Sequence, residues 1–318
     1  MIIKEMNKII PPFNAEIGQE FDARSVQLKK ANSTLTNAFL ITLFLGAAFV
    51  DLALRERLPL SLGLAFTFVS LILYAIRSTR NLNEQWTYTR VVAESIKSEW
   101  YKYVVGGGDY PCNDEVGEEY YKDLFERNIQ EKISEYRDNI IDVGGSPIEF
   151  SFVIDSNTTD LRNKPFSERL EVYKARRIKD QLSWYEKKSL IMKNKEKRYS
   201  WGFGLTVSVG FLIGLVKLFN WSSLNLINDS DWFSIAVALG FALESKNSLF
   251  QHERLSITYK KSANDLRESL NKINDSENDV KKDENVFVEF VEDVENRISN
   301  EHKSWSLTTN SKNLPNFK

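Results

Sequence analysis

The stretch AFLITLFLGAAFVDLAL, from Ala38 to Leu54, is followed almost at once by LPLSLGLAFTFVSLILYAI, from Leu58 to Ile76. Each run is long enough to cross a bilayer, because about 17 to 25 apolar residues span a hydrocarbon core of about 30 Å. Asp51 is the only charged residue in either run. The connecting RERLP is so short that the two segments must be antiparallel. The sequence therefore predicts a membrane-spanning hairpin with spans at 38–54 and 58–76.

A second pair of apolar runs lies later in the chain. WGFGLTVSVGFLIGLV occupies residues 201–216, and DWFSIAVALGFAL occupies residues 231–243. The last run has only about 12 strongly apolar residues, so its span, at about 225–243, needs interfacial help from Trp232 to cross a bilayer. We expect a second hairpin here, in which the fourth span is the weakest.

The same helical seam follows each hairpin, and the two seams are related by one constant offset in sequence number. The seam comprises Ala93, Ile96, Trp100 and Tyr103 in the first half, and Ala263, Leu266, Leu270 and Ile273 in the second. Alternating steps of three and four residues are typical of a coiled-coil-like face. Trp86 extends the first seam upstream. The pattern therefore indicates two copies of one unit, each with an amphipathic entry helix, a hairpin and an amphipathic exit helix.

The predicted fold is an all-α membrane protein with two tandem transmembrane helical hairpins and long cytoplasmic coiled-coil-like helices. The first unit covers residues 20–110, a cytoplasmic connector covers 111–164, and the second unit covers 165–305. In the connector, GGSPIEFSFVIDSNTTD at 144–160 is compatible with one short strand. Pro165 is placed to open a new helix, and residues 306–318 are expected to form a disordered tail.

Basic residues near the spans indicate the orientation. Sixteen of them flank the entry and exit sides of the hairpins, against three on the loop side, Arg55, Arg57 and Lys217. Basic flanks mark the cytoplasmic side of membrane segments. We therefore expect a multi-pass protein of the cell membrane with both termini in the cytoplasm.

The composition offers little for catalysis or for nucleic-acid binding. The 42 Lys and Arg residues are balanced by 44 Asp and Glu residues, and the formal net charge is −2, so no basic excess favours a nucleic acid. Cys112 is the only cysteine, which excludes an intrachain disulfide and a thiolate metal cluster. No HExxH, GxSxG or GxxxxGK[ST] pattern is present. We expect no enzyme activity, no catalytic residue, no cofactor and no metal site.

Asp51 and His252 each admit two interpretations. Asp51 lies close to the end of its span, so it is either an interfacial acid near Arg55 or Arg57, or a pore-facing group. His252 falls on the seam of the second exit helix, where it is either a packed histidine or a pH sensor.

Small residues in the spans are candidates for close helix packing. Gly210 and Gly214 form a GxxxG motif in the third run. Gly46 and Gly63 in the first hairpin and Gly240 in the fourth run add to this pattern. Such motifs indicate that helices touch without identifying the partner.

The residues before the second hairpin carry a family resemblance. EVYKARRIKDQLSWYEKKS, from Glu171 to Ser189, leads through a lysine-rich stretch into the hairpin. The grouping comprises Arg177, Ile178, Asp180, Gln181, Trp184 and Tyr185. With the tail VENRISNEHKSW, this order resembles the SLATT domain, the SMODS- and SLOG-associating two-transmembrane effector domain of bacterial conflict systems. The first half, with QWTYTRVVAESIKSEWYKY at 85–103, is similar to another branch of the same family.

The resemblance implies a bacterial inner-membrane effector that oligomerises and forms a pore or disrupts the membrane in a nucleotide-linked antiviral system. Its implied partners are the lipid bilayer, further copies of this chain, and a separate protein that senses or generates a nucleotide. The main alternative is a non-conducting membrane scaffold or sensor that recruits partners through its cytoplasmic helices. A third interpretation is a regulated ion channel with a housekeeping role. The sparse polar groups of the spans fit a narrow pore or one that forms by rearrangement.

Overall fold

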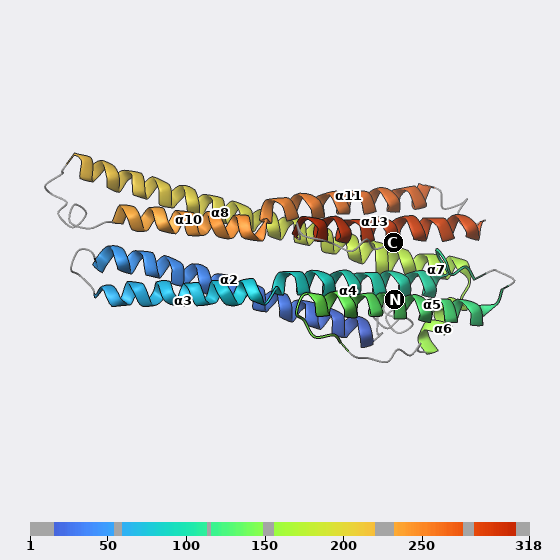
Figure 1. The fold of residues 1–318 in the computed structure, drawn as a ribbon. Helices are drawn as coiled ribbons and strands as arrows, with labels where there is room; N and C mark the ends of the chain where they lie inside the picture. The colour runs from blue at the N-terminus through green and yellow to red at the C-terminus, as the bar shows by residue number, and fades with distance from the viewer. Residues whose placement is uncertain are drawn as a thin grey trace. The chain divides into compact units, whose positions relative to one another are not determined.

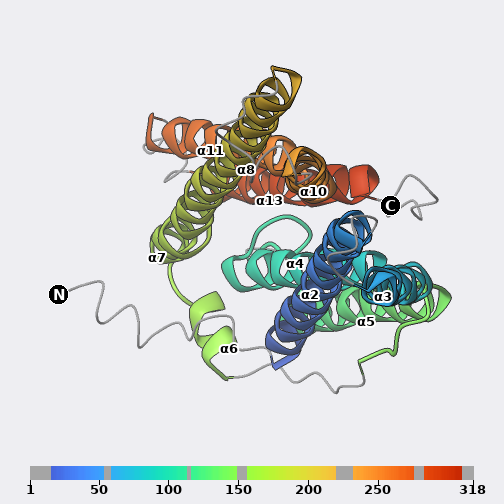
Figure 2. The same cartoon turned by 90° about the vertical axis from the view of Figure 1, so that its left-hand side faces the viewer.

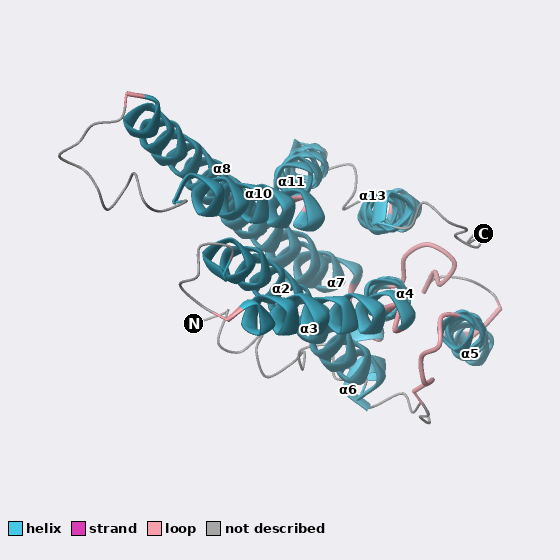
Figure 3. Ribbon diagram, turned by 60° about the vertical axis from the view of Figure 1, so that its left-hand side comes forward, coloured by secondary structure: helices cyan, strands magenta, loops and turns pink. Residues whose placement is uncertain are grey.

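A computed structural model describes the backbone of most of the chain (Figure 1). The described residues are 16–53, 59–112, 116–148, 156–219, 232–275 and 283–309. They divide into two compact units, each described by itself below. The hairpin unit comprises Ala31–Arg80 and Lys188–Ile257, and the stem unit takes in the described remainder. Every regular element among the described residues is a helix (Figure 3), which confirms the all-α prediction.

The hairpin unit contains two helical hairpins. In the first, the apolar end of α2 (Glu16–Ala53) precedes α3 (Leu60–Thr79). In the second, the apolar end of α8 (Asp180–Leu218) precedes α10 (Trp232–Phe250). The helices α2 and α8 are 38 and 39 residues long and pass from the stem unit into the hairpin unit without a break.

Three helical stretches are long and apolar enough to cross a membrane, namely Glu20–Ala53, Leu60–Val105 and Phe166–Leu218. They include residues 38–53, 60–76 and 201–216 of the first three predicted spans. The helix α10 is not among them, and its 19 residues end in a polar stretch that includes Glu244 and Lys246. Its N-terminal part nevertheless pairs with α8 as described below, and a complete fourth span stays a prediction.

The stem unit consists of helices on both sides of α4 (Leu82–Val105), which contacts α5 and α13. Figure 2 shows this group viewed towards the helix ends. The other elements are α5 (Glu118–Asp142), α6 (Ser156–Arg162), α7 (Phe166–Tyr173), the π-helix η1 (Lys174–Lys179), most of α11 (His252–Asp275) and α13 (Glu284–Thr309).

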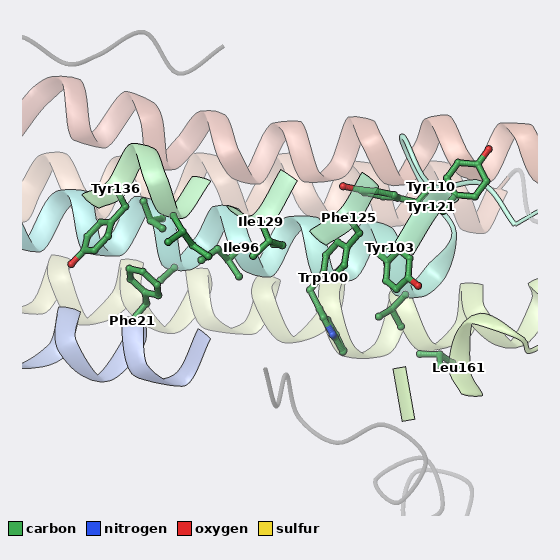
Figure 4. Packing of buried hydrophobic residues seen from close by; sticks show 14 of the residues in the cluster. Phe21, Ile96, Trp100, Tyr103, Tyr110, Tyr121, Phe125, Ile129, Tyr136 and Leu161 are labelled. Atoms are coloured by element: carbon green, nitrogen blue, oxygen red, sulfur yellow. The ribbon is translucent and has the colours of Figure 1, made fainter. Parts of the chain in front are cut away.

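Two apolar cores stabilise the stem unit. In the first, α4 and α5 bury aromatic side chains against each other, with Tyr103 stacked on Phe125 at a centroid distance of 4.5 Å (Figure 4). Phe21 of α2 meets Tyr136 edge-to-face in the same core. In the second, the fully buried Ile178 and Phe287 belong to one cluster with residues of α11 and α13.

The predicted repeat has a structural counterpart. Ala93 and Ala263, which are equivalent positions of the two seams, are both buried. At the same offset, Asn81 and Gln251 both adopt left-handed backbone, with φ of 44° and 46°. Asn81 lies between α3 and α4, and Gln251 lies between α10 and α11. Each exit helix is thus separated from its hairpin by the same kind of turn.

The described part of the region predicted as a connector contains two helices. The 25-residue helix α5 packs on α4, and α6 occupies part of the segment in which a strand was considered. Residues 149–155 of that segment lie outside the described residues, so the strand stays a prediction. The helix α13 continues to Thr309, so residues 306–309 are helical and were wrongly predicted as tail. Residues 310–318 lie outside the description.

Candidate functional site

The first hairpin is held together by close approach of its two helices at glycines. A Cβ atom on Gly46 would lie 2.6 Å from Thr67 Oγ1, and one on Gly63 would lie 2.6 Å from the backbone nitrogen of Val50. Phe49 and Phe66 pair at 5.2 Å between ring centroids. Partners advance along one helix as they retreat along the other, so α2 and α3 are antiparallel, as predicted.

The second hairpin shows the same antiparallel order. A Cβ atom on Gly240 of α10 would lie 2.9 Å from Thr206 Oγ1 of α8, whereas one on Gly210 would meet Ala236 at an ordinary 3.5 Å. Gly214 lies near Phe233. These approaches identify the partner of the GxxxG motif as α10. They also show that α10 accompanies α8 from Phe233 to Leu243.

Five hydroxyl groups of the spans donate hydrogen bonds within their own helices. Thr67 donates to the carbonyl of Gly63 at 2.9 Å, Ser70 donates to Thr67 at 2.8 Å, and Ser208 donates to Gly204 at 2.9 Å. Thr42 and Thr206 likewise each donate to a backbone carbonyl one turn earlier in their own helices. Such bonding satisfies polar groups inside a membrane. These five side chains therefore present no stripe of free hydroxyls in this conformation.

The outer faces of the hairpins are apolar and exposed. Only 22%, 11% and 6% of the three most apolar 18-residue windows is buried inside the structure. Phe68, Leu71, Phe211 and Phe241 are each at least 60% exposed. Exposed apolar surface of this extent requires a partner. The length and composition of these helical stretches are those of helices that cross a lipid bilayer.

Asp51 lies in α2, within the last turn of the described helix, and is half-buried. The basic residues considered as its neighbours, Arg55 and Arg57, lie outside the described residues. The two interpretations of Asp51, an interfacial acid and a pore-facing group, both stay predictions.

The stem unit contains a buried ion pair at the first residue of the predicted family grouping. Arg177 Nε donates to Glu295 Oε1 at 2.8 Å, and Nη2 donates to Oε2 at 2.6 Å, with both side chains 2% exposed. The hydroxyl of Tyr173 donates to the same carboxylate at 2.9 Å, and the Tyr101 ring lies 4.9 Å from the guanidinium. The pair joins η1 to α13.

Arg177 lies in the π-helix, where one extra residue per turn changes the direction of the following side chains. Ile178 beside it is fully buried. Further along α8, Asp180 is exposed and Gln181 is half-buried. Trp184 and Tyr185 contact each other edge-to-face, and both rings contact Tyr259 of α11. The grouping thus mixes core residues with surface residues.

The two predicted seam tryptophans of α4 have different surroundings. Trp100 is buried, and its ring meets Tyr101 edge-to-face at 4.9 Å. Trp86 is half-buried, and Lys29 of α2 places its Nζ atom 4.5 Å from the ring centroid. Trp86 therefore contributes to the contact between the entry and exit helices of the first unit.

Two further arginines hold the loop that ends α4, and sequence patterns did not single them out. Arg162 donates to the carbonyls of Tyr103 and Tyr110 and to the Glu118 carboxylate. Arg169 donates to the carbonyl of Val105 and to Glu284. Both side chains are almost fully buried. Cationic groups at a helix C-terminus complement its dipole, and here they also satisfy its last carbonyls.

Cys112 in this loop is half-buried. Its Sγ atom donates to the carbonyl of Arg162 at 3.8 Å. Burial raises the pKa of the Cys112 thiol above its ordinary value. The described residues contain no group of three or more His, Cys, Asp or Glu placed to hold a metal ion.

His252 begins α11 and is buried in the hairpin unit. Its ring stacks on Tyr199 of α8 at 5.3 Å, and Nδ1 lies 3.3 Å from Asn247 Oδ1. Burial, together with Lys195 and Lys246, lowers the pKa of His252 to about 4. The side chain is therefore a neutral packed histidine at pH 7.

Taken together, these features define an all-α membrane protein with two antiparallel hairpins and a helical stem. Residues 16–170 match the model of SMODS and SLOG-associating 2TM effector domain 3. Residues 173–305 match the model of SMODS and SLOG-associating 2TM effector domain 1. The chain belongs to this SLATT family and carries two of its domains in tandem, as the resemblance predicted. Neither the curated proteins nor the solved structures include a significant match.

Proposed function

We propose that this protein is an effector of the bacterial inner membrane that oligomerises through its hairpins and perforates or depolarises that membrane. The observation that supports the proposal most directly is the continuity of α2 and α8 between the two units. A displacement of either helix in the stem is transmitted along its axis to a span, because a helix is a rigid element. The stem would then act as the receiver of a signal and the hairpins as the responding part.

Two spans cannot enclose a pore, so conduction requires several hairpins side by side. The tandem domains supply two hairpins per chain, and further copies of the chain would supply the rest. We place both termini in the cytoplasm and assign the trigger to a separate nucleotide-sensing or nucleotide-generating partner. In this proposal the protein catalyses no reaction and needs no cofactor.

A non-conducting scaffold is the second candidate. It is favoured by one observation, that the donor hydrogens of the Thr67, Ser70 and Ser208 hydroxyls are taken up by their own helix backbones. The effector proposal interprets the same bonding as a resting state. The two candidates therefore differ in whether the assembled protein conducts ions across the membrane.

The test is overproduction in bacterial cells loaded with a membrane-potential dye, combined with chemical cross-linking of the membrane fraction. A high concentration of the protein drives assembly by mass action and so replaces the triggering partner. We expect depolarisation to appear together with cross-linked oligomers. The variant Gly240→Leu should abolish both, because Gly240 faces Thr206. Gly204→Leu is the matched control, since a Cβ atom on Gly204 meets nothing within 4 Å. An intact potential in cells that contain the cross-linked oligomer would contradict the effector proposal and support the scaffold.

A further inference from the structure

The two hairpins differ in the charge of the helix that enters them. Positions 188–200, which directly precede the third span, include five basic residues and one acidic residue. Positions 25–37, which directly precede the first span, include two basic residues, and positions 31–37 carry no charge. The chain as a whole has a net charge of −2, so this basic segment is a local feature of α8.

The basic side chains of this segment face outward. Lys193, Lys195, Lys197 and Arg198 are all exposed. Within the described part of the hairpin unit, none of these four forms an ion pair with a carboxylate. They are therefore available to an external anion.

An aromatic residue marks the depth at which the segment meets the apolar run. Trp201 is the first residue of the third predicted span and is 79% exposed. Exposed tryptophans of membrane proteins concentrate at the level of the lipid headgroups. The four basic residues precede Trp201 by three to eight positions, which is about 5 to 12 Å along the helix at about 1.5 Å per residue, and this places them beside the headgroup region.

A second helix, α10, adds a positive charge to the region just before Trp201. Lys246 of α10 extends over the Tyr199 ring, with Nζ 5.3 Å from the centroid. Lys195 and Lys246 both act on the buried His252 and lower its pKa, whereas the Glu196 carboxylate acts on it in the opposite sense. Basic groups thus converge from two helices at one end of the second hairpin.

We propose that this basic collar, comprising Lys193, Lys195, Lys197, Arg198 and Lys246, binds the headgroups of anionic phospholipids. Each Lys or Arg near a membrane surface adds to the attraction of anionic lipid, and clusters of four to eight beside a span are typical of headgroup binding. The first hairpin has Arg77 and Arg80 on its exit side but only two basic residues in the corresponding entry segment, so we assign the stronger preference to the second domain. The proposal holds whether or not the protein conducts.

The test is native mass spectrometry of the purified full-length protein after incubation with equal amounts of phosphatidylglycerol and phosphatidylcholine of identical acyl chains. We expect the unmodified protein to retain phosphatidylglycerol preferentially. In the fourfold variant Lys193→Gln, Lys195→Gln, Lys197→Gln and Arg198→Gln, this preference should fall at least about tenfold. It should also weaken with added salt, because the charges are exposed.

A control variant removes the same charge from the stem unit. It replaces Arg127, Arg137, Lys179 and Lys272, all exposed, with Gln. Its lipid preference should equal that of the unmodified protein, and a variant with Lys193, Lys195 and Lys197 replaced by Arg should also keep it. Circular dichroism checks that each variant is folded.

Three outcomes would overturn the proposal. The unmodified protein could show no preference for the anionic lipid, the fourfold variant could retain it, or the control variant could lose it equally. The unmodified protein could also show no lipid preference while the fourfold variant loses self-association. That result would mean that the collar binds an acidic surface of a second copy of the chain instead of lipid.

Discussion

Arg177 and Glu295 are separated by 118 residues and form a two-point ion pair that is closed to solvent, with N–O distances of 2.8 and 2.6 Å. The pair joins the π-helix before α8 to the last helix of the second domain. Because α8 continues into a span, this contact fixes the stem end of the same helix that enters the membrane.

Breaking this pair should destabilise the protein strongly. Arg177→Met leaves the Glu295 carboxylate buried without its cation, which typically costs about 3 to 5 kcal/mol in free energy of unfolding. The measurement is denaturant or thermal unfolding in mild detergent. The double variant Arg177→Met, Glu295→Leu should recover most of the loss, since it leaves no unpaired charge.

The matched control is the exposed pair between Arg297 and Asp293 on α13, with an N–O distance of 2.8 Å. Arg297→Ala should cost less than about 1 kcal/mol, because exposed ion pairs contribute little. Equal losses for Arg177→Met and Arg297→Ala would show that burial of the Arg177 pair has no energetic weight.

The glycines of the hairpins should differ in their tolerance to substitution. Gly63→Ala places a methyl group 2.6 Å from a backbone atom of Val50, so the helices must separate, at a cost of about 1 to 3 kcal/mol. Gly210→Ala meets Ala236 at 3.5 Å and should be tolerated. Thermal unfolding in detergent measures both, and a Gly210→Ala variant less stable than Gly63→Ala would refute the described packing.

His252 should make stability depend on pH. Its pKa of about 4 lies below the ordinary value of 6.5, so the unfolded chain binds more protons than the folded protein between these pH values. Stability attributable to His252 is therefore complete above pH 6.5 and is lost as the pH falls towards 4. Carboxylates also titrate there, so the measurement is the difference in unfolding midpoint between the unmodified protein and His252→Gln. A difference independent of pH would contradict the assignment.

Replacing the left-handed residue before each exit helix, Asn81 or Gln251, with glycine should stabilise the protein. Gln251→Gly removes the Cβ penalty at φ 46° and should raise stability by about 0.5 to 1 kcal/mol. Asn81→Gly should gain less, since asparagine tolerates this conformation better than glutamine. The unfolding midpoints of the two variants provide the comparison, and a larger gain at Asn81 would contradict it.

Cys112 should react slowly with thiol reagents. It is half-buried and its pKa is raised by burial, so little thiolate is present at pH 7. The measurement is the rate of maleimide labelling in the folded protein and after unfolding. The control is Ser134→Cys at an exposed position of α5, in a Cys112→Ser background. Labelling of Cys112 as fast as that of the control would contradict its burial.

Features that depend on a periodic pattern of residues along the chain could be predicted from the sequence. Apolar runs located the hairpins, and the constant offset between the two seams placed Ala93 and Ala263 at equivalent buried positions. The candidate glycines were found because small residues stand out in apolar runs. Their partners were not, since a one-dimensional pattern does not say which atom a glycine faces.

The buried arginines were missed for a different reason. Arg162 bonds to carbonyls 52 and 59 residues away, and backbone carbonyls carry no residue-specific signal. Arg177 was noted only as part of a family grouping, because its partner Glu295 lies among several similar carboxylates of α13. The π-helix has no sequence pattern that distinguishes it from the α-helix around it. The buried arginine contacts depend on polar groups that are far apart in the sequence, so local patterns could not predict them.

The tandem arrangement has a consequence for assembly. Two hairpins on one chain meet at an effective concentration that the chain itself sets, so their encounter does not depend on how much protein the cell makes. Only the association of one chain with another responds to expression level. Any closed ring built from whole chains contains an even number of hairpins, with the two domain types in equal amounts.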